Sequence, residues 1–446
     1  MTKLPTSQNV KKVLGHLGLQ QGVIYHKGQV MQERDNTDVE LPFRQESNFY
    51  YLTGCNEPDF HVVIDIASGK TTLVAPPVVP DHVMWMGLPD TLEQMQAKYD
   101  VDQVVYSDSL ASLLQSQKVY VLPITKTDCL QGQAVVSDVE SKQLENAVIA
   151  ARLVKADWEI EIMRQANKIS SDAHIKLWQA SYPGCTEAQL HALFLYESAR
   201  HGAFFQSYYP IVGCGKNAAT LHYNKNNAVM ENANDVVLVD AGAEYNVYAS
   251  DITRVFPVGG KFSPEARTIY TIVLNMQKAS IDMCRAGVAY EDIHLKAMEI
   301  GCDGLIEAGI LVGDRQELLD KDVMAAFYPH GIGHSIGLDV HDVGGYPDGV
   351  GRIDRPGWRN LRMRRVLAPG NVVTIEPGVY FFDYLINPVL ENPATAKYVN
   401  IDMLNKYKSV GGVRIEDNIV ITEGEPLNLT TVPKEIDEVE ALMAKQ

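Results

Sequence analysis

Asp235-Val-Val-Leu-Val-Asp240-Ala-Gly242-Ala is the stretch that decides the fold of this chain. Its apolar run predicts a buried strand, and an aspartate closes that strand just before an X-Gly pair. The pattern returns in Asn371-Val-Val-Thr-Ile-Glu376-Pro-Gly378-Val. A second similarity relates Ser250-Asp251-Ile252 to Ile415-Glu416-Asp417, because each is expected to begin a strand with a carboxylate among β-branched neighbours. We infer that the second half of the chain is internally duplicated.

The first of these repeats predicts a β-hairpin that carries two aspartates on facing strands. If the turn centres between Tyr245 and Asn246, Asp240 and Asp251 lie directly opposite each other. Opposed residues on an antiparallel pair hold their β-carbons about 4.5–5.5 Å apart, and two carboxylates at that range repel. A cation between them would remove the repulsion. Two similar halves with two carboxylates each would enclose a metal site.

A fifth candidate ligand comes from the glycine-rich stretch Pro329-His-Gly-Ile-Gly-His334-Ser-Ile-Gly-Leu-Asp-Val-His341, in a chain with only 12 histidines. Glycine lets the backbone of such a stretch pass close to another group. Four carboxylates and the imidazole of His334 form an oxygen-rich set without cysteine, which suits Mn²⁺ better than a structural zinc site would. A pair of such ions makes bound water a nucleophile, so hydrolysis is the expected reaction.

These segments, together with Val340-His-Asp-Val-Gly-Gly345 and Gly411-Gly-Val-Arg-Ile-Glu-Asp417, resemble the proline-specific peptidases of the pita-bread metallopeptidase family. The resemblance covers about residues 150–430, with its motifs in the family's order. It implies two divalent ions, expected to be Mn²⁺ with Co²⁺ or Zn²⁺ as alternatives, and a bridging hydroxide. The implied metal ligands are Asp240, Asp251, His334, Glu376 and Glu416. The residues alone do not say which carboxylate bridges the ions.

The resemblance also implies which side chains act on the substrate. The implied catalytic residues are His222, His330, His341 and Glu376, with Glu376 as the proton shuttle. The implied substrate-binding residues are Arg362, Arg414, Tyr208 and Trp85. Arg414, two residues before Glu416, is expected to anchor either the metal-site carboxylates or the substrate. Arg362 would clamp the terminal carboxylate of a dipeptide, since a guanidinium fork suits that group. We expect the neighbouring Arg364 and Arg365 to be solvated instead. Trp85 is expected either to reach a partner subunit of a homodimer or to lie in the core.

Three functions remain open on this basis. The first is an Xaa-Pro dipeptidase, favoured by the match at Arg362. The second is an Xaa-Pro aminopeptidase, which removes the first residue of longer peptides with the same chemistry. Activity on a dipeptide against a tripeptide separates these two. The third is a non-catalytic pita-bread binding module, which is disfavoured because all five ligand positions are filled.

The expected architecture has two domains, consistent with 446 residues and 46% hydrophobic content. Residues 1–145 alternate short apolar strands with helices and predict an α/β domain. The resemblance implies that this domain serves dimerisation and covers the active site. Residues 150–446 are expected to form the α+β pita-bread catalytic domain, a curved antiparallel sheet covered by helices and built as a pseudo-two-fold duplication. We expect helices around residues 157–167, 186–201, 264–285 and 290–309.

The overall charge and the apolar runs limit the partners. A formal charge of −17 disfavours nucleic acid and anionic membranes. No apolar run approaches the roughly 20 residues that span a bilayer, and the N-terminus lacks an apolar signal core. Six scattered cysteines without a C-x-x-C pair fit a reducing compartment. A cytoplasmic enzyme acting on Xaa-Pro peptides is therefore expected, and the Asn428-Leu-Thr430 sequon is expected to be unused.

Overall fold

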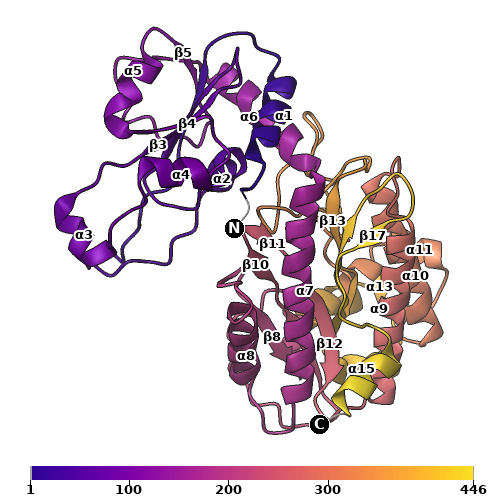
Figure 1. Cartoon of the computed structure of the whole chain (residues 1–446). Coiled ribbons are helices and arrows are strands. Elements are labelled where there is room, and N and C mark those ends of the chain that lie inside the picture. Colours follow the sequence, from indigo (N-terminus) through magenta and orange to yellow (C-terminus); the bar gives the residue numbers. More distant parts are fainter. Residues whose placement is uncertain (1–2, 445–446) are drawn as a thin grey trace. The chain divides into compact units, whose positions relative to one another are not determined.

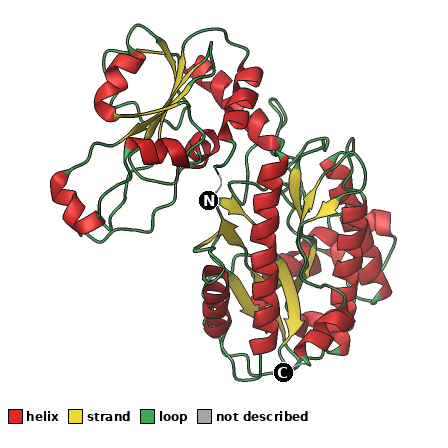
Figure 2. Ribbon diagram, viewed as in Figure 1, coloured by secondary structure: helices red, strands yellow, loops and turns green. Residues whose placement is uncertain are grey.

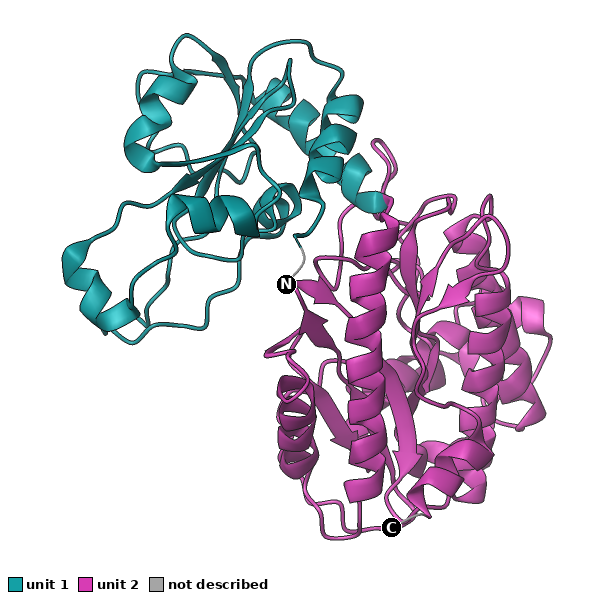
Figure 3. Cartoon of the chain, in the orientation of Figure 1, with its two compact units in different colours: residues 1–153 teal, residues 154–446 magenta. Residues whose placement is uncertain are grey.

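The computed structural model describes residues 3–444 and divides the chain into two compact units, residues 1–153 and residues 154–446 (Figures 1 and 3). We call them unit 1 and unit 2. The division lies between Leu153 and Val154, a few residues beyond the expected boundary. A continuous helix occupies residues 138–153, so the stretch around residues 140–150 belongs to unit 1.

Unit 1 is a mixed α/β domain, as expected. Its sheet has six strands in the order β4-β3-β2-β1-β5-β6, with β1 antiparallel to β2 and parallel to β5. The strands are β1 (Val23–Lys27), β2 (His61–Asp65), β3 (Thr71–Ala75), β4 (Gln103–Tyr106), β5 (Lys118–Tyr120) and β6 (Ala134–Val135). The helices are α1 (Thr6–Leu17), α2 (Ser47–Thr53), α3 (Pro80–Met86), α4 (Leu92–Lys98), η1 (Ser107–Ser109), α5 (Leu110–Leu114) and α6 (Asp138–Leu153).

Unit 2 contains antiparallel strand pairs covered by helices (Figure 2). The strands are β7 (Phe205–Gln206), β8 (Ile211–Cys214), β9 (Val236–Asp240), β10 (Ala243–Tyr245), β11 (Tyr248–Ala249), β12 (Thr253–Pro257), β13 (Val372–Ile375), β14 (Gly378–Tyr380), β15 (Gly412–Arg414), β16 (Asp417–Val420) and β17 (Leu427–Asn428). The longer helices are α7 (Asp157–Ala180), α8 (Glu187–Ala199), α9 (Pro264–Asp282) and α10 (Tyr290–Glu307). The shorter ones are η2 (Gly215–Ala219), α11 (Arg315–Asp320), η3 (Met324–Ala326), α12 (Asp383–Glu391), α13 (Pro393–Ala396), α14 (Ile401–Tyr407), η4 (Lys408–Val410) and α15 (Ile436–Met443).

The internal duplication inferred from the sequence is present in the strand pairing. β9 pairs with β12, and β13 pairs with β16 in the same antiparallel manner. The helices follow the same plan, because α7 packs on α8 beside the first strand set whereas α9 packs on α10 beside the second. A backbone hydrogen bond of 3.1 Å from the Glu416 amide to the Thr253 carbonyl joins the two halves.

The starts of α8 and α9 follow from local sequence. Thr186 caps α8 by accepting from the Gln189 amide, and the Gln189 side chain accepts from the Thr186 amide in return. Ser263 caps α9, and Pro264 follows at the first helical position, where its missing N–H costs nothing.

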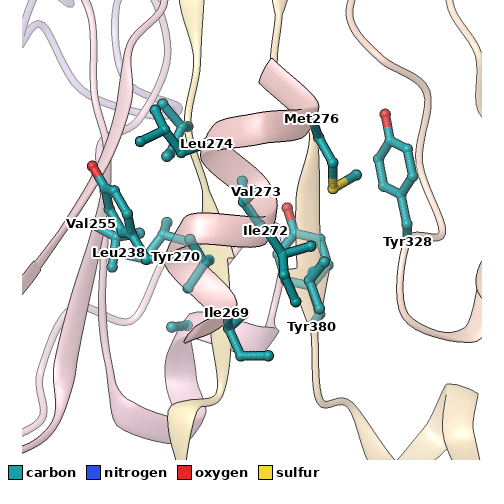
Figure 4. Packing of buried hydrophobic residues seen from close by; sticks show 14 of the residues in the cluster. Leu238, Val255, Ile269, Tyr270, Ile272, Val273, Leu274, Met276, Tyr328 and Tyr380 are labelled. Atoms are coloured by element: carbon teal, nitrogen blue, oxygen red, sulfur yellow. The ribbon is translucent and has the colours of Figure 1, made fainter. Parts of the chain in front are cut away.

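The core of unit 2 lies between α9 and the strands of both halves. Figure 4 shows α9 side chains, including Tyr270 and Met276, between Leu238 and Val255 on one side and Tyr380 on the other. Trp178 of α7 is also fully buried in this cluster. Burial of large apolar side chains stabilises a fold by about 1.5–3 kcal/mol each. The core therefore fixes the strands that carry the acidic residues.

The hairpin register predicted from the sequence is wrong. The turn is Asn246-Val247, with φ of 46° and 66°, so that Tyr245 pairs with Tyr248. Two consecutive positive φ values are the geometry of a tight hairpin turn. A β-branched residue rarely adopts positive φ, so the residue type of Val247 gives no sign of this turn.

The shifted register changes the partner of Asp240, which pairs with Thr253 instead of Asp251. Asp251 lies two residues before Thr253, in the connection between β11 and β12. Asp240 and Asp251 nevertheless line one cavity, so the expectation that they share a site survives the error in register.

Two glycines allow a close approach of segments in unit 2. A β-carbon on Gly411 would lie 1.9 Å from the Gly215 carbonyl oxygen, and Gly411 has φ of +74°. A β-carbon on Gly412 would lie 2.4 Å from the Ala218 oxygen. Helix η2 therefore packs directly on the start of β15.

We expect Gly411→Ala to destabilise the protein by about 1–3 kcal/mol, because alanine disfavours this backbone conformation and its methyl group meets η2. Denaturant unfolding of unit 2 measures the change. Gly424→Ala is the control, since a β-carbon there would meet nothing within 4 Å. Equal effects of the two substitutions would contradict the role given to Gly411.

Candidate metal centre and active site

A cavity of about 930 Å³ in unit 2 brings the predicted site residues together. Every residue that lines it belongs to unit 2. The lining includes the five predicted metal ligands Asp240, Asp251, His334, Glu376 and Glu416. It also includes the predicted catalytic and substrate residues Tyr208, His222, His330, His341, Arg362 and Arg414. Trp85 is the exception among the predicted residues.

The tightest group in the cavity is Asp251, His334 and Glu416, whose ligand atoms all lie within 4.8 Å of one another. His334 Nε2 lies 3.3 Å from Asp251 Oδ2 and 3.5 Å from Glu376 Oε1. The common register of the β13–β16 and β14–β15 pairs places Glu376 opposite Glu416. Residues from both halves of the duplication thus meet at one point.

The ring of His334 is oriented as a metal ligand. Its Nδ1 donates to the Ser335 carbonyl oxygen at 3.0 Å, which leaves the Nε2 lone pair directed at the carboxylates. Burial lowers the pKa of His334 to about 4, so the ring is neutral at neutral pH. A backbone carbonyl that fixes the tautomer is the usual outer partner of a metal-binding histidine.

Gly333 makes this placement feasible. A β-carbon at Gly333 would lie 2.2 Å from the Thr374 carbonyl oxygen and 2.5 Å from the Tyr290 hydroxyl. The His334 amide donates to Thr374 Oγ1, and the Thr374 amide donates to the His334 carbonyl. The segment that carries His334 therefore packs directly on β13 at Thr374, two residues before Glu376.

The carboxylates repel one another in this arrangement. Burial is the largest cause, and the neighbouring carboxylates are the next, that raise the pKa of Asp251 and Glu416 well above the usual range. The pKa of Glu376 is raised in the same way, first by burial and second by the charge of Glu416. Buried charge without a partner is costly. Divalent cations would remove this cost.

Two carboxylate oxygens are left free to bind such cations. Asp240 Oδ1 and Glu416 Oε1 are buried and accept no hydrogen bond from residues 3–444. Their other oxygens are engaged: Glu416 Oε2 accepts from Thr253 Oγ1 at 2.7 Å, and Asp240 Oδ2 accepts from Arg414 at 2.6 Å. Oxygens from carboxylates with one imidazole are a suitable donor set for hard divalent ions. The residues present therefore fit a metal centre.

The Arg414 guanidinium forms its hydrogen bonds with other side chains of the protein. It donates to Asp240, to Thr253 Oγ1 at 3.0 Å and to the Tyr380 hydroxyl at 2.9 Å. Its side chain is buried. Of the two roles expected for Arg414, these contacts favour that of an anchor for the Asp240 carboxylate.

His330 is held at the end of the same chain of contacts. Its Nε2 accepts from the Tyr380 hydroxyl at 2.8 Å, and its Nδ1 donates to the Gly331 carbonyl oxygen at 2.8 Å. Burial lowers the pKa of His330 to about 3, so the ring is neutral. Both ring nitrogens have partners in the protein, and a substrate would have to displace one of them.

Several residues that support the ligands were missed in the sequence. The Asn418 side chain accepts from the Asp251 amide at 3.0 Å and donates to the Asp251 carbonyl, so it clamps the backbone of that ligand. Asn418 lies two residues after Glu416, and period-2 spacing would have placed it on the ligand face. Thr253 follows Asp251 at the same spacing.

A buried ion-pair network fixes the backbone behind Glu416. Arg254 donates to the Glu416 carbonyl at 2.8 Å and to Asp417 Oδ1 at 2.6 Å. Lys434 donates to Asp417 Oδ2, and Arg254 also donates to the Val432 carbonyl. Arg254 and Lys434 hold the pKa of Asp417 well below its usual range despite its burial, so the network stays charged and intact. Asn428 donates to the same carboxylate.

Arg362 differs from its neighbours Arg364 and Arg365 in its contacts. The Arg362 side chain lines the cavity and has no hydrogen bond or ion pair with any residue between 3 and 444. Arg364 donates to Glu291 at 2.7 Å, and Arg365 donates to the Gly344 carbonyl. Neither Arg364 nor Arg365 lines the cavity. They are held by the protein, whereas the expectation was that they are solvated.

The remaining predicted residues differ in their burial. His341 packs edge-on against His334, with ring centroids 4.4 Å apart. Burial, followed by Asp240 and Asp251, raises the pKa of Tyr208 well above its ordinary value, so its hydroxyl stays protonated. His222 is exposed within the cavity lining. Trp85 lies on α3 of unit 1 and is 77% exposed, so the alternative of a core residue is wrong.

Comparison with known families gives two matches along the chain. Residues 161–423 match the model of metallopeptidase family M24. Residues 6–120 match the model of the aminopeptidase P N-terminal domain. The first match spans the segments that carry all the cavity residues, and the second lies within unit 1.

Similar proteins cover nearly the whole chain. A probable Xaa-Pro aminopeptidase of Botryotinia fuckeliana is 42% identical over 449 residues, covering 99% of this chain and 97% of that protein. One from Metarhizium acridum is 44% identical over 432 residues, covering 95% of this chain and 85% of its own length. The solved structure of a Pseudomonas aeruginosa aminopeptidase is similar with a TM-score of 0.83 at 32% identity, covering 100% of this chain and 99% of that chain. Proline aminopeptidase P II from Yersinia pestis gives 0.81 at 32%, with 100% of both chains covered.

We expect Asp251→Asn to have opposite effects on the metal-free and metal-loaded protein. It should raise the free energy of unfolding of the metal-free protein by about 1 kcal/mol, because one repelling carboxylate is removed. Mn²⁺ at about a hundredfold excess over Kd should stabilise the unsubstituted protein by about 2.7 kcal/mol, and the variant far less.

Thermal unfolding of chelator-treated protein with and without Mn²⁺ measures both effects. Asp172→Asn is the control, since Asp172 is an exposed partner of Lys168 on α7. A metal-free variant that is less stable than the unsubstituted protein, or equal stabilisation by Mn²⁺, would rule out repulsion among the carboxylates as the dominant effect.

Proposed function

Because the chain belongs to metallopeptidase family M24, we propose that it is a proline-specific peptidase that hydrolyses the bond between an N-terminal residue and proline, using two divalent ions. The observation that carries this proposal is the convergence of Asp240, Asp251, His334, Glu376 and Glu416 in one cavity together with His222, His341 and Arg362. The relatives' names support the choice of substrate.

The five ligands would hold the ions, which we propose to be Mn²⁺ from the oxygen-rich donor set. Bound there, divalent ions polarise the scissile carbonyl and make water more acidic. Arg414 holds Asp240 in place, and Ser335 fixes the tautomer of His334. The chain therefore supplies a preformed set of ligands, which limits the reorganisation needed during the reaction.

The other cavity residues act on the peptide. We propose that Glu376 takes a proton from the attacking water and gives it to the leaving proline nitrogen. That nitrogen belongs to a tertiary amide and carries no N–H for a general protease to grip. His222 and His341 lie in the cavity lining and would donate to the oxyanion that forms at the scissile carbonyl. The Tyr208 hydroxyl is a further donor.

The preferred length of the substrate has two candidates. Arg362 supports a dipeptidase, because its guanidinium lines the cavity without an internal partner among residues 3–444 and matches a free carboxylate on proline. The names of the relatives favour an Xaa-Pro aminopeptidase, which accepts longer peptides. Both candidates use the same metal centre and differ only in whether a further residue is attached to the proline.

We expect the Mn²⁺-loaded protein to cleave an X-Pro dipeptide, and Arg362→Ala to lower kcat/KM for it about tenfold to a hundredfold through KM, because a charge-assisted hydrogen bond is lost. Kinetics with X-Pro and X-Pro-Y peptides measure the effect. The tripeptide should lose much less, since its carboxylate lies one residue further on.

Arg359→Ala is the matched control, because Arg359 also lines the cavity but stands 3.8 Å from Asp354. Preferred cleavage of the tripeptide, with Arg362→Ala neutral, would establish the aminopeptidase. If neither peptide is hydrolysed by the metal-loaded protein, the proposed function is wrong.

We also propose that unit 1 supports a homodimer. Met84, Trp85, Met86 and Leu88 are all at least 60% exposed, and an exposed apolar patch of this kind commonly marks a protein contact.

A cytoplasmic location is proposed from the six cysteines, which are all free thiols. In the described part of the chain, every helix is too short or too polar to cross a bilayer.

We expect Trp85→Ser to shift the protein from dimer toward monomer, since large aromatic residues dominate interface energies. Sedimentation velocity over a range of protein concentrations measures the shift. Val139→Ser in unit 1 is the control, because Val139 is 80% exposed but lies on α6. An unchanged dimer, or a monomer before substitution, would refute the role of Trp85.

A further inference from the structure

Glu187 is a fully buried carboxylate at the start of α8 that takes no part in the metal centre. Its Oε1 accepts from the Cys214 amide and from Asn217 Nδ2, both at 2.9 Å. Its Oε2 accepts from the Tyr223 hydroxyl and from the Ala228 amide, also both at 2.9 Å. One side chain therefore satisfies four donors, all from residues 214–228.

The position of Glu187 makes this charge tolerable. It is the first residue of α8, where the helix dipole favours a negative charge. A buried carboxylate with four donors has all its strong acceptor sites occupied. If the carboxylate were removed, the four buried donors would lose their acceptor, and each would carry the full free-energy cost of desolvation. The conformation of the segment that supplies these donors therefore depends on the Glu187 carboxylate.

Residues 214–228 form the segment that carries His222, and we call it the His222 loop. Leu221, His222 and Asn224 of this loop line the cavity. The loop has η2 at its start, which rests on Gly411 and Gly412. Near its end the Asn226 side chain accepts from the Val212 amide at 2.8 Å.

The His222 side chain itself is held by little. It is exposed, and no hydrogen bond joins it to another residue of the described chain. Its position is therefore set by the backbone on either side. Tyr223, the next residue, is fixed by its hydroxyl on Glu187. The backbone around His222 is also held by the Tyr223 amide, which donates to the Thr220 carbonyl at 3.2 Å. The carboxylate of Glu187 is the side chain that ties this turn to α8 through Tyr223.

We propose that Glu187 is a positioning residue that holds His222 in place for the reaction. The inference rests on the proposed function, in which His222 donates to the oxyanion. A misplacement of about 1 Å far from the chemistry can lower the rate about a hundredfold. Glu187 does not line the cavity and has no hydrogen bond to the five ligands, so its effect must pass through the loop.

The first test compares Glu187→Gln with the unsubstituted Mn²⁺-loaded protein. An amide NH₂ in place of one carboxylate oxygen faces two donors and cannot accept from them. We expect kcat/KM for the X-Pro peptide to fall about tenfold to a hundredfold, with Mn²⁺ affinity by calorimetry unchanged. Glu197→Gln on the same helix is the control, because among residues 3–444 the side chain of Glu197 forms an ion pair with Arg200 alone, at 3.4 Å. Its kcat/KM should stay unchanged.

A double-mutant cycle tells positioning of His222 from a general loss of structure. If Glu187 acts through His222, Glu187→Gln combined with His222→Ala is no slower than His222→Ala alone. Multiplied losses would overturn the proposal, as would a His222→Ala variant with full activity. Should Glu187→Gln fail to fold by circular dichroism, Tyr223→Phe replaces it in the cycle, since it removes only one of the four hydrogen bonds.

Amide hydrogen exchange gives a readout that does not need activity. We expect faster exchange across residues 214–228 in Glu187→Gln, with the β9–β12 pair still protected. Unchanged exchange in the His222 loop would overturn the proposal even if activity falls. If the unsubstituted protein cleaves no X-Pro peptide, the proposed function fails by itself. The exchange result then decides alone whether Glu187 fixes the loop.

Discussion

The repulsion among buried carboxylates is the constraint on which the rest of unit 2 depends. Asp251, Glu376 and Glu416 meet in one cavity, and burial with mutual repulsion raises the pKa of each. Only a rigid frame keeps such groups together before a cation arrives. The duplicated strand pairs provide that frame, and α9 packs against both. Arg414 offsets part of the charge at Asp240, and cations would offset the remainder.

The sequence was informative where a local pattern carried the signal. The repeated strand ending in an acidic residue before X-Gly predicted both the duplication and Asp240 and Glu376, because strand period and residue type act over short distances. The hairpin register was missed, since Val247 adopts positive φ only in its tertiary setting. The roles of Tyr380 and Glu187 were also missed. Each depends on a partner distant in the sequence, and nothing local marks such a contact.

The site is built from two kinds of support. Asp240 lies on β9, and the other carboxylate ligands lie within two residues of a strand end. The neighbouring backbone pairing holds them, together with side chains such as Asn418, which bonds both backbone groups of Asp251. The histidines that would act on substrate lie instead on loops, where pairing cannot hold them. Buried charged side chains support these loops. Glu187 holds the His222 loop, and Lys155 pairs with Asp342 at 2.9 Å beside His341. Satisfied buried polar groups of this kind specify one arrangement.

The network of Arg254, Asp417 and Lys434 also bears on how the protein is made. Arg254 is translated long before its carbonyl partner Val432, and Lys434 adds a second positive charge beside Asp417. A nascent chain that ends before Lys434 therefore carries all five ligands but leaves the Asp417 side of the network incomplete. Ribosomal synthesis must pass this point before the backbone behind Glu416 is locked.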